Sequence, residues 1–357
     1  MIRVLIVDDS ALMRKFLAGL FEAEEGFMVA TARDGADALS RIGSFNPDVV
    51  TLDVEMPTMD GLACLDRIMV EHPCPVVMVS AVTEQGADAT MEALQMGAVD
   101  FVAKPTGTIS LHREEFGPLI KERVRQAAGI RIRRSARLAD RLRFNAGATR
   151  QPSEGRVAPA LSHSGDHRLV LVGASTGGPP ALDALLSGLP SEFRWPILIA
   201  QHMPRTFTAS FARRLDSLCK LPVREVNAPT AIEDGCVYVG RGDADMMVAR
   251  RGDQLIAIPV PSSAQHLWHP SVDRLVMSAM QHMGPHQLVG ILLTGMGNDG
   301  AAAMAELRKA GGYTIAEAEE SAVVWGMPGE LVRLNGASDI VALPHMAERL
   351  LEIGPWR

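Results

Sequence analysis

The chain has 357 residues, more than one hydrophobic core usually organises, so its length predicts two domains. With 47% hydrophobic and 22% charged residues, its composition is that of an ordinary globular protein. A net charge of -7 and an aromatic content of 4% argue against binding to nucleic acid, through the phosphate backbone or by stacking on single strands. No apolar run approaches the roughly 20 residues that cross a bilayer, so we expect no membrane insertion.

The first residues of the chain and its cysteines indicate in which cellular compartment the protein is expected. The opening stretch, MIRVLIVDDS, has an apolar core that is too short for a secretory signal and meets two aspartates at once. The cysteines show no paired short spacing, which disfavours a zinc site or a disulfide framework; they are Cys64, Cys74, Cys219 and Cys236. We therefore expect a protein of the reducing cytoplasm.

Short runs of Val, Ile and Leu alternate with amphipathic helical patterns in the first part of the chain. These runs are RVLIVDDS, DVVTLDVEMP, PVVMVSA and VDFVAKP. Near-continuous apolar strands alternating with helices predict a parallel sheet covered on both faces. We expect this doubly wound α/β domain to span residues 1–124.

Acidic, hydroxyl and basic side chains follow these predicted strands where each one ends. They are Asp8, Asp9, Asp53, Ser80 and Lys104. Ligands bind outside the carboxyl ends of parallel strands, so this edge predicts a site. Carboxylates brought together repel unless a hard cation such as Mg²⁺ neutralises them, and a lysine and a hydroxyl could hold a phosphoryl group on one of them. Any one acid alone could merely start a turn or cap a helix, but the whole set at successive strand ends argues against that alternative.

The motifs VDDS, LDVEMPTMDG, VS and KP occur in the order found in the receiver domain of two-component response regulators, which residues 1–124 resemble. The resemblance implies a flavodoxin-like sheet. It also implies that Asp53 accepts a phosphoryl group from a chemotaxis histidine kinase. Asp8 and Asp9, together with Asp53, would then bind Mg²⁺.

The same resemblance assigns residues that respond to phosphorylation. It implies that Ser80 and Lys104 sense the phosphoryl group and that Phe101 is the aromatic side chain that repacks on activation. It further implies a cis peptide bond between Lys104 and Pro105, a form confined almost entirely to proline.

Residues 125–166 read as a linker between two domains. The segment opens with a basic stretch that is compatible with a helix, then becomes rich in Gly, Ser, Pro and Ala with no apolar periodicity. Its arginines raise the alternative of a nucleic-acid-binding arm, but a charge run is more often a solvated helix end followed by a tether.

Alternating strands and helices return in residues 167–357, which predicts a second doubly wound α/β domain. The strand-like runs are RLVLVGAS, WPILIAQHMP, VYVG and QLVGILLTGMGNDG. The first of them leads into Gly173-Ala174-Ser175-Thr176-Gly177, which fits the Gly-x-Ser-x-Gly turn that exposes a nucleophilic serine between a strand and a helix. A phosphate-binding loop fits poorly, because Gly177-Gly178-Pro179 stands where Gly-Lys-Ser/Thr is required.

A nucleophilic serine requires a base and a group that orients the base. His202 and Asp299 each follow a predicted strand of the second domain, so we expect them at the same sheet edge as Ser175. His266 and His269 remain rival candidates for the base. The order Ser, His, Asp differs from that of α/β-hydrolases, which predicts a different fold around a triad recognised by geometry.

These motifs, together with QHMPRTFTASFARRL, HPSVDRL and VVWGMPG, make residues 167–357 similar to the catalytic domain of chemotaxis protein-glutamate methylesterases. The resemblance implies a Rossmann-like domain without a cofactor in the esterase site, with Ser175 as nucleophile, His202 as general base and Asp299 as the orienting acid. The N–H groups of Met296 and Thr176 become candidate oxyanion donors. The implied activity is hydrolysis of glutamyl γ-methyl esters on methylated chemoreceptors, and deamidation of receptor glutamines at the same site.

One segment departs from the family pattern. Relatives commonly show Ala-Pro and a histidine after the VYV strand, whereas this chain reads GRGDADM from Gly240 to Met246. We expect the chemistry to survive and the substrate preference to be affected. Two other classes of function remain open: a response regulator whose second domain is a non-catalytic scaffold, and a DNA-binding regulator that uses the basic linker.

Overall fold

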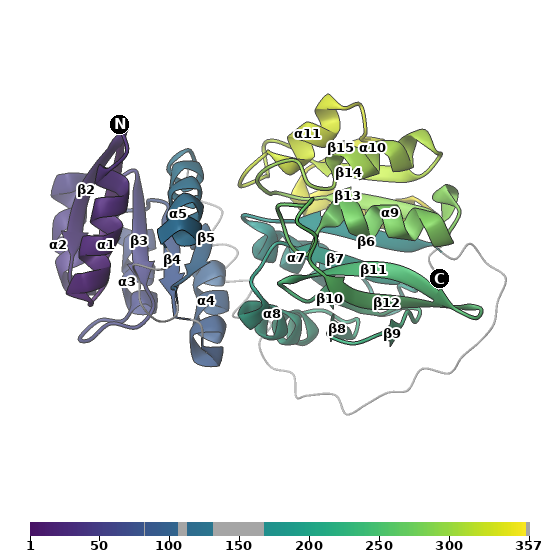
Figure 1. The fold of residues 1–357 in the computed structure, drawn as a ribbon, viewed down its shortest axis with the longest axis horizontal. Coiled ribbons are helices and arrows are strands. Elements are labelled where there is room, and N and C mark those ends of the chain that lie inside the picture. Colours follow the sequence, from purple (N-terminus) through teal and green to yellow (C-terminus); the bar gives the residue numbers. More distant parts are fainter. Residues whose placement is uncertain (82, 106–112, 131–167, 355–357) are drawn as a thin grey trace. The chain divides into compact units, whose positions relative to one another are not determined.

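The computed structural model describes residues 1–81, 83–105, 113–130 and 168–354, and the chain divides into two compact units, Met1–Gly155 and Arg156–Arg357 (Figure 1). Each unit is described by itself below. No helix among the described residues is both long and apolar enough to cross a bilayer.

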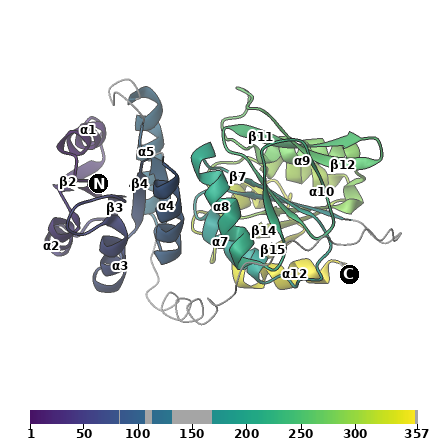
Figure 2. The same ribbon diagram turned by 90° about the horizontal axis from the view of Figure 1, so that it is seen from below.

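The first unit is a parallel sheet in the strand order β2-β1-β3-β4-β5, which is the flavodoxin-like order expected from the sequence. Its elements are β1 (Ile2–Val7), α1 (Ala11–Glu22), β2 (Phe27–Ala32), α2 (Gly35–Phe45), β3 (Val49–Asp53), α3 (Gly61–Glu71), β4 (Val76–Ser80), α4 (Glu84–Met96), β5 (Asp100–Ala103) and α5 (Arg113–Ala128). Helices α1 and α5 cover one face, and α2, α3 and α4 cover the other (Figure 2). Strands β3 and β4 are completely buried, as sequences with both faces covered require.

The second unit is built on a larger parallel sheet in the order β15-β14-β13-β6-β7-β10-β8, which confirms a second doubly wound domain. Its strands are β6 (Leu169–Ala174), β7 (Ile197–Gln201), β8 (Val223–Val226), β10 (Val237–Gly240), β13 (Leu288–Leu292), β14 (Tyr313–Glu317) and β15 (Asp339–Val341). Its helices are α7 (Gly178–Ser187), α8 (Arg205–Leu218), α9 (Val272–His282), α10 (Ala301–Lys309), α11 (Met327–Arg333) and α12 (Met346–Glu352), with short 3-10 turns at η2 (Pro285–Gln287) and η3 (Leu343–His345). Helices α7, α8 and α12 lie on one side of this sheet and α9 and α10 on the other (Figure 2).

A small antiparallel sheet, β11-β12-β9, was not anticipated from the sequence. It consists of β9 (Thr230–Ala231), β11 (Ala244–Arg251) and β12 (Gln254–Pro261), with β11 packed against α9. The segment that departs from the family pattern therefore ends inside β11, where Asp245 and Met246 are buried. Its residues form a supporting layer of the second unit as well as a stretch of loop.

Helix α5 continues through Ala128, in agreement with a linker whose first residues are helical. Residues 131–166 lie outside the described part of the chain, so the expected domain bounds stay predictions. One expectation needs correction at the end of the first unit. The Lys104–Pro105 bond is not cis: within the described ranges the cis peptide is His269–Pro270. The trans form is the intrinsically favoured one, and Lys104 reaches its carboxylate partners from it.

Candidate active site

The pairing of β6 with β7 brings Ser175 and His202 to the same edge of the second sheet. Ala174 is opposite Gln201 in the register, so Ser175 and His202 are the next residues of two adjacent parallel strands. The His202 backbone N–H donates to Ala174 O at 3.0 Å, which extends the pairing by one more bond. Neighbouring strands lie about 4.8 Å apart, so the sheet itself sets the spacing between these two residues.

The Ser175 turn is tight because glycines stand where side chains would collide. Gly177 has φ +75° and begins α7 as its N-cap, and a Cβ there would lie 2.6 Å from the Val323 side chain. A Cβ on Gly295, from the loop after β13, would lie 2.8 Å from Ser175 Cβ. Ser175 is 2% exposed, and its Oγ has no hydrogen-bond partner among the described residues.

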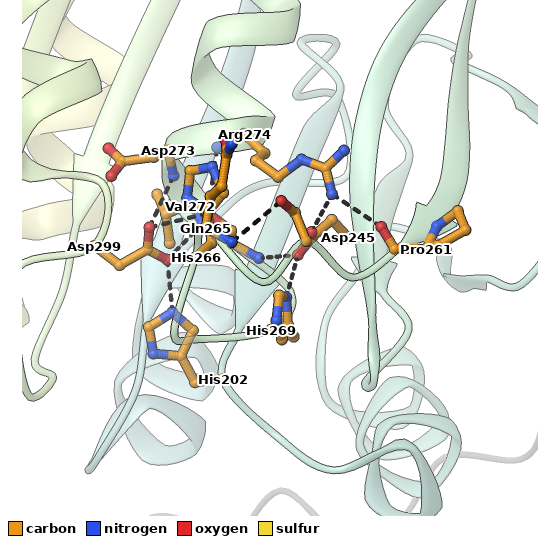
Figure 3. Close-up of polar contacts among 12 residues, drawn as sticks. His202, Asp245, Pro261, Gln265, His266, His269, Val272, Asp273, Arg274 and Asp299 are labelled. Carbon is orange, nitrogen blue, oxygen red and sulfur yellow. Dashed lines mark hydrogen bonds and ion pairs between the residues drawn. The ribbon is translucent and has the colours of Figure 1, made fainter.

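His202 forms a buried pair with Asp299. Its Nε2 lies 2.8 Å from Asp299 Oδ2 (Figure 3). Because a carboxylate only accepts, Nε2 carries the proton and the lone pair is on Nδ1, which is buried and has no partner in the described ranges. This is the reverse of the usual serine-protease arrangement, in which Nδ1 faces the aspartate. The indole ring of Trp268 stacks on the imidazole with centroids 5.6 Å apart.

The N-terminus of α9 holds the Asp299 carboxylate. It accepts from Val272 N at 2.7 Å, from Asp273 N at 3.1 Å and from Ser271 Oγ at 3.0 Å (Figure 3). Burial alone would raise the pKa of Asp299, but the His202 hydrogen bond and these N–H donors outweigh it and hold the pKa below its usual value. Asp299 therefore stays ionised and keeps the ring of His202 in one tautomer.

The rival histidines have other partners. His266 Nδ1 lies 3.3 Å from Ser271 Oγ, and His269 Nδ1 lies 2.8 Å from Asp245 Oδ1 (Figure 3). Of the three histidines considered as the general base, His202 is the one that is hydrogen-bonded to Asp299. Asp245 also accepts from Ser271 N at 2.7 Å and pairs with Arg274, so the departing segment anchors the turn that precedes α9.

The N–H groups of Thr176 and Met296, the two candidate oxyanion donors, belong to peptide groups whose carbonyl oxygens are held by hydrogen bonds. Ser175 O accepts from Gly178 N at 2.8 Å, and Gly295 O accepts from Gly326 N at 3.1 Å and Met327 N at 2.8 Å. The C=O and N–H of a trans peptide point in opposite directions, so each clamp also fixes the direction of the next N–H, on Thr176 or Met296. The VVWGMPG motif thus supports one of the two peptides.

In the first unit, the acids expected at the strand ends come together. Carboxylate oxygens of Asp8, Asp9 and Asp53 lie within 4.8 Å of one another. Lys104 Nζ lies 2.9 Å from Asp8 Oδ2 and 2.6 Å from Asp53 Oδ2. Burial raises the pKa of Asp53 to about 6, an effect that Asp8 reinforces and Lys104 opposes. Asp9, Asp53 and Lys104 line an open cleft of about 740 Å³.

The two remaining switch candidates are buried. Ser80 is the last residue of β4, and its hydroxyl donates to Gly86 O at 3.1 Å. Phe101, in β5, is 8% exposed. Their roles in sensing phosphorylation stay predictions, because this geometry represents one state of the domain.

Known proteins resemble both halves of the chain. The family model described as CheB methylesterase matches residues 170–350, and the model described as response regulator receiver domain matches residues 4–114. A protein named protein-glutamate methylesterase/protein-glutamine glutaminase 2 from Rhodopseudomonas palustris (strain BisB18) is 52% identical and covers 99% of this chain and 98% of its own length. One numbered 3, from Vibrio cholerae serotype O1, is 43% identical over 98% of this chain and 96% of its own.

The chain belongs to the CheB methylesterase family. Among solved structures, the Thermotoga maritima CheB methylesterase catalytic domain matches 53% of this chain and 99% of its own, with a TM-score of 0.51 and 32% sequence identity. The receiver model accounts for residues 4–114, and receiver domains bind Mg²⁺ in connection with phosphorylation.

The acidic cluster of this CheB-family chain fits that ion. All the groups offered are carboxylates, the oxygen ligands that Mg²⁺ prefers. Burial and the neighbouring Asp8 raise the pKa of Asp53 although Lys104 and the Glu55 N–H oppose them, so a cation at this site would favour the ionised carboxylate. Asp8, Asp9 and Asp53 are the residues that would hold the cation.

Sequence reasoning missed the groups that support the triad. Ser271 and the first N–H groups of α9 hold Asp299, Trp268 covers His202, and Gln201 contacts the Ser175 turn. Ser271 was recognisable as a helix N-cap in HPSVDRL. No pattern indicated that this helix start would lie against a carboxylate 28 residues further along the chain.

Proposed function

We propose that the second unit hydrolyses glutamyl γ-methyl esters of chemoreceptors to glutamate and methanol, and releases ammonia from receptor glutamines at the same site. The observation that carries the proposal is the arrangement of Ser175, His202 and Asp299 at one sheet edge. Ser175 Oγ and His202 Nδ1, at adjacent strand ends, have no hydrogen-bond partner within the described part of the chain, and a 2.8 Å hydrogen bond joins His202 to Asp299. The names and near-full-length identity of the relatives support the substrate class.

In the first half-reaction, Ser175 Oγ bonds to the ester carbonyl carbon while its proton passes to His202 Nδ1. Asp299 stabilises the imidazolium that forms, and the N–H groups of Thr176 and Met296 donate to the negative oxygen. Collapse breaks the carbon–methoxy bond, and the proton on Nδ1 leaves with the departing group as methanol.

In the second half-reaction, water replaces the alcohol. His202 Nδ1 takes a proton from water as its oxygen bonds to the acyl carbon, and the bond to Ser175 Oγ then breaks as that oxygen recovers the proton. The products are glutamate and the original enzyme. No cofactor is needed in this sequence, because every proton moves between Ser175, His202 and the substrate or water.

We further propose that the receiver controls this reaction. A histidine kinase supplies the phosphoryl group, Asp53 accepts it with Mg²⁺ held by the acidic cluster, and Ser80, Lys104 and Phe101 respond. Without phosphorylation the receiver obstructs the esterase site, and phosphorylation shifts the population towards an accessible one. The four cysteines are free thiols, which fits residence in the reducing cytoplasm.

Methanol release from methylated receptor membranes tests the activity. The wild-type protein is expected to release methanol, faster after treatment with a small-molecule phosphodonor, and Ser175→Ala is expected to lose at least about 10³ in rate, since the residual catalysis comes from binding and oxyanion stabilisation. Equal release by Ser175→Ala and wild type, or no release from any of several methylated receptors, would contradict the esterase proposal and favour a binding scaffold.

A further inference from the structure

Gln201 is a buried polar residue that the mechanism above does not use. It is the last residue of β7, directly before His202, and is 2% exposed. Its Nε2 donates to Ser175 O at 2.9 Å and to His202 O at 3.2 Å. Both partners are carbonyl oxygens, so the NH₂ side of the amide must face them.

We infer that Gln201 is a positioning residue that orients the Thr176 N–H towards the developing oxyanion and links the nucleophile turn to the base. The inference rests on the proposed function. Ser175 O and Thr176 N belong to one planar trans peptide, so a donor that pulls the oxygen towards β7 directs the N–H away from β7. The second bond, to His202 O, ties the same amide to the residue that carries the base.

The contact between Gln201 and Gly178 makes this arrangement specific. A Cβ on Gly178 would lie 2.0 Å from Gln201 Oε1 and 2.9 Å from Gln201 Cδ. The second glycine of the Ser-Thr-Gly-Gly turn is therefore required to leave room for the glutamine amide. Gly178 N donates to Ser175 O at 2.8 Å as well, so a helix N–H and a side-chain amide hold one carbonyl from two sides.

A carbonyl held by two donors stays in place while charge develops nearby. If Gln201 lost its NH₂ group, Ser175 O would keep one of its two bonds and the peptide could rotate. The N–H would then have to reorient during the reaction, which is the cost that a preorganised oxyanion site avoids. Substrate binding would change much less than turnover, because the affected donor acts mainly on the transition state.

The test compares Gln201→Met, which keeps length and removes the donor, with Thr314→Val in the full-length protein. Thr314 is the matched control: it is fully buried and hydrogen-bonded to Gly336 O, but it lies at the start of β14, away from the edge that carries Ser175. Measurements are kcat and KM for methanol release, the affinity for a boronic acid that forms a tetrahedral serine adduct, and Tm.

For Gln201→Met we expect kcat and boronic-acid affinity to fall on the order of 10²-fold, with KM within about threefold of wild type. Thr314→Val should lose a similar amount of thermal stability and keep both values. Gly178→Ala, which displaces the glutamine amide from the other side, should behave like Gln201→Met.

Two outcomes would overturn the inference. If wild type is active but Gln201→Met matches Thr314→Val in kcat and boronic-acid affinity, Gln201 is only structural. If wild type neither releases methanol nor binds the boronic acid, the proposed function fails and this inference fails with it.

Discussion

At the scale of single residues, Gly295 packs so close to Ser175 that it has no room for a side chain. A Cβ at this position would lie 2.8 Å from Ser175 Cβ and 2.4 Å from Met327 Sδ, closer than real side-chain atoms approach. We expect Gly295→Ala to lower kcat by at least about 10²-fold, because a displacement near 1 Å at a reacting group costs that much. The kcat for methanol release tests this, and the rate of labelling by a serine-reactive phosphonate, which reports the reactivity of Ser175, should fall with it.

Gly19→Ala is the control for that substitution. Gly19 lies within α1 with no atom close to where its Cβ would be, so alanine should leave the labelling rate unchanged. Labelling of Gly295→Ala at the wild-type rate would mean that the loop after β13 moves aside without disturbing Ser175.

The residues that perform chemistry were easier to predict than those that hold them. Ser175, His202 and Asp299 each follow an apolar strand, so strand ends pointed to all three. Gln201 sits inside a run whose burial looks like ordinary core, and nothing in that run shows that its amide bonds across to the Ser175 turn. Such partners depend on strand register, which a single sequence does not specify.

At the scale of elements, the loop after β13 is tied to the end of β14 by a buried carboxylate. Glu317 Oε2 accepts from Thr294 N at 2.7 Å, and Thr294 Oγ1 donates to Thr176 O at 2.9 Å. Burial raises the pKa of Glu317 above its usual value, and the hydrogen bonds from Thr294 N and Ser321 Oγ only partly oppose this effect. Glu317 thus supports the loop that carries the candidate oxyanion donor Met296. Because its pKa is raised in the folded protein, its contribution to the free energy of unfolding depends on pH.

The sign of that dependence follows from proton linkage. Between its unfolded and folded pKa values Glu317 is more protonated in the folded state, so its contribution to stability falls as pH rises and levels off above the folded pKa. Glu317→Gln cannot ionise, so we expect the Tm of the variant relative to wild type to rise as pH increases through this window. Thermal unfolding measured from pH 4 to 8 checks it.

Exposed Glu306, on the surface of α10, supplies the comparison for that series: Glu306→Gln makes the same substitution at a carboxylate in water and not in the interior. A Tm gap between Glu317→Gln and wild type that stays constant over the same range would show that the pKa of Glu317 is the same in the folded and unfolded states, which contradicts the prediction.

The antiparallel layer shows where element prediction failed. Strands β11 and β12 pair around a turn at Gly252; in β11, Met246 and Val248 are buried and the residues that follow each of them are partly exposed. The parallel strands are recognisable in the sequence as continuous apolar runs, whereas β11 ends in two charged residues, Arg250 and Arg251. The segment from Gly240 to Met246 was assessed by its departure from a motif, so no strand was predicted there.

At the scale of the whole molecule, the chain joins two units that each carry a complete candidate site. The acidic cluster is built only from first-unit strands, and the triad only from second-unit elements. Neither site needs the other for its geometry, so their presence in one chain calls for a regulatory explanation. The sequence predicted both units from their strand patterns, while any coupling between them depends on surfaces that strand patterns do not describe.

Two models of control by the receiver predict different rates for the isolated second unit. In one the receiver obstructs the esterase site, and in the other it activates the triad by direct contact. A protein beginning at Arg168, which retains all of the second sheet, should release methanol faster than the unphosphorylated full-length chain. Asp53→Ala in the full-length chain should remain at the slow rate with or without phosphodonor, because the acceptor carboxylate is gone. If the truncated protein is no faster than the unphosphorylated whole, obstruction is wrong. If it is also slower than the phosphorylated whole, the receiver must activate the triad instead.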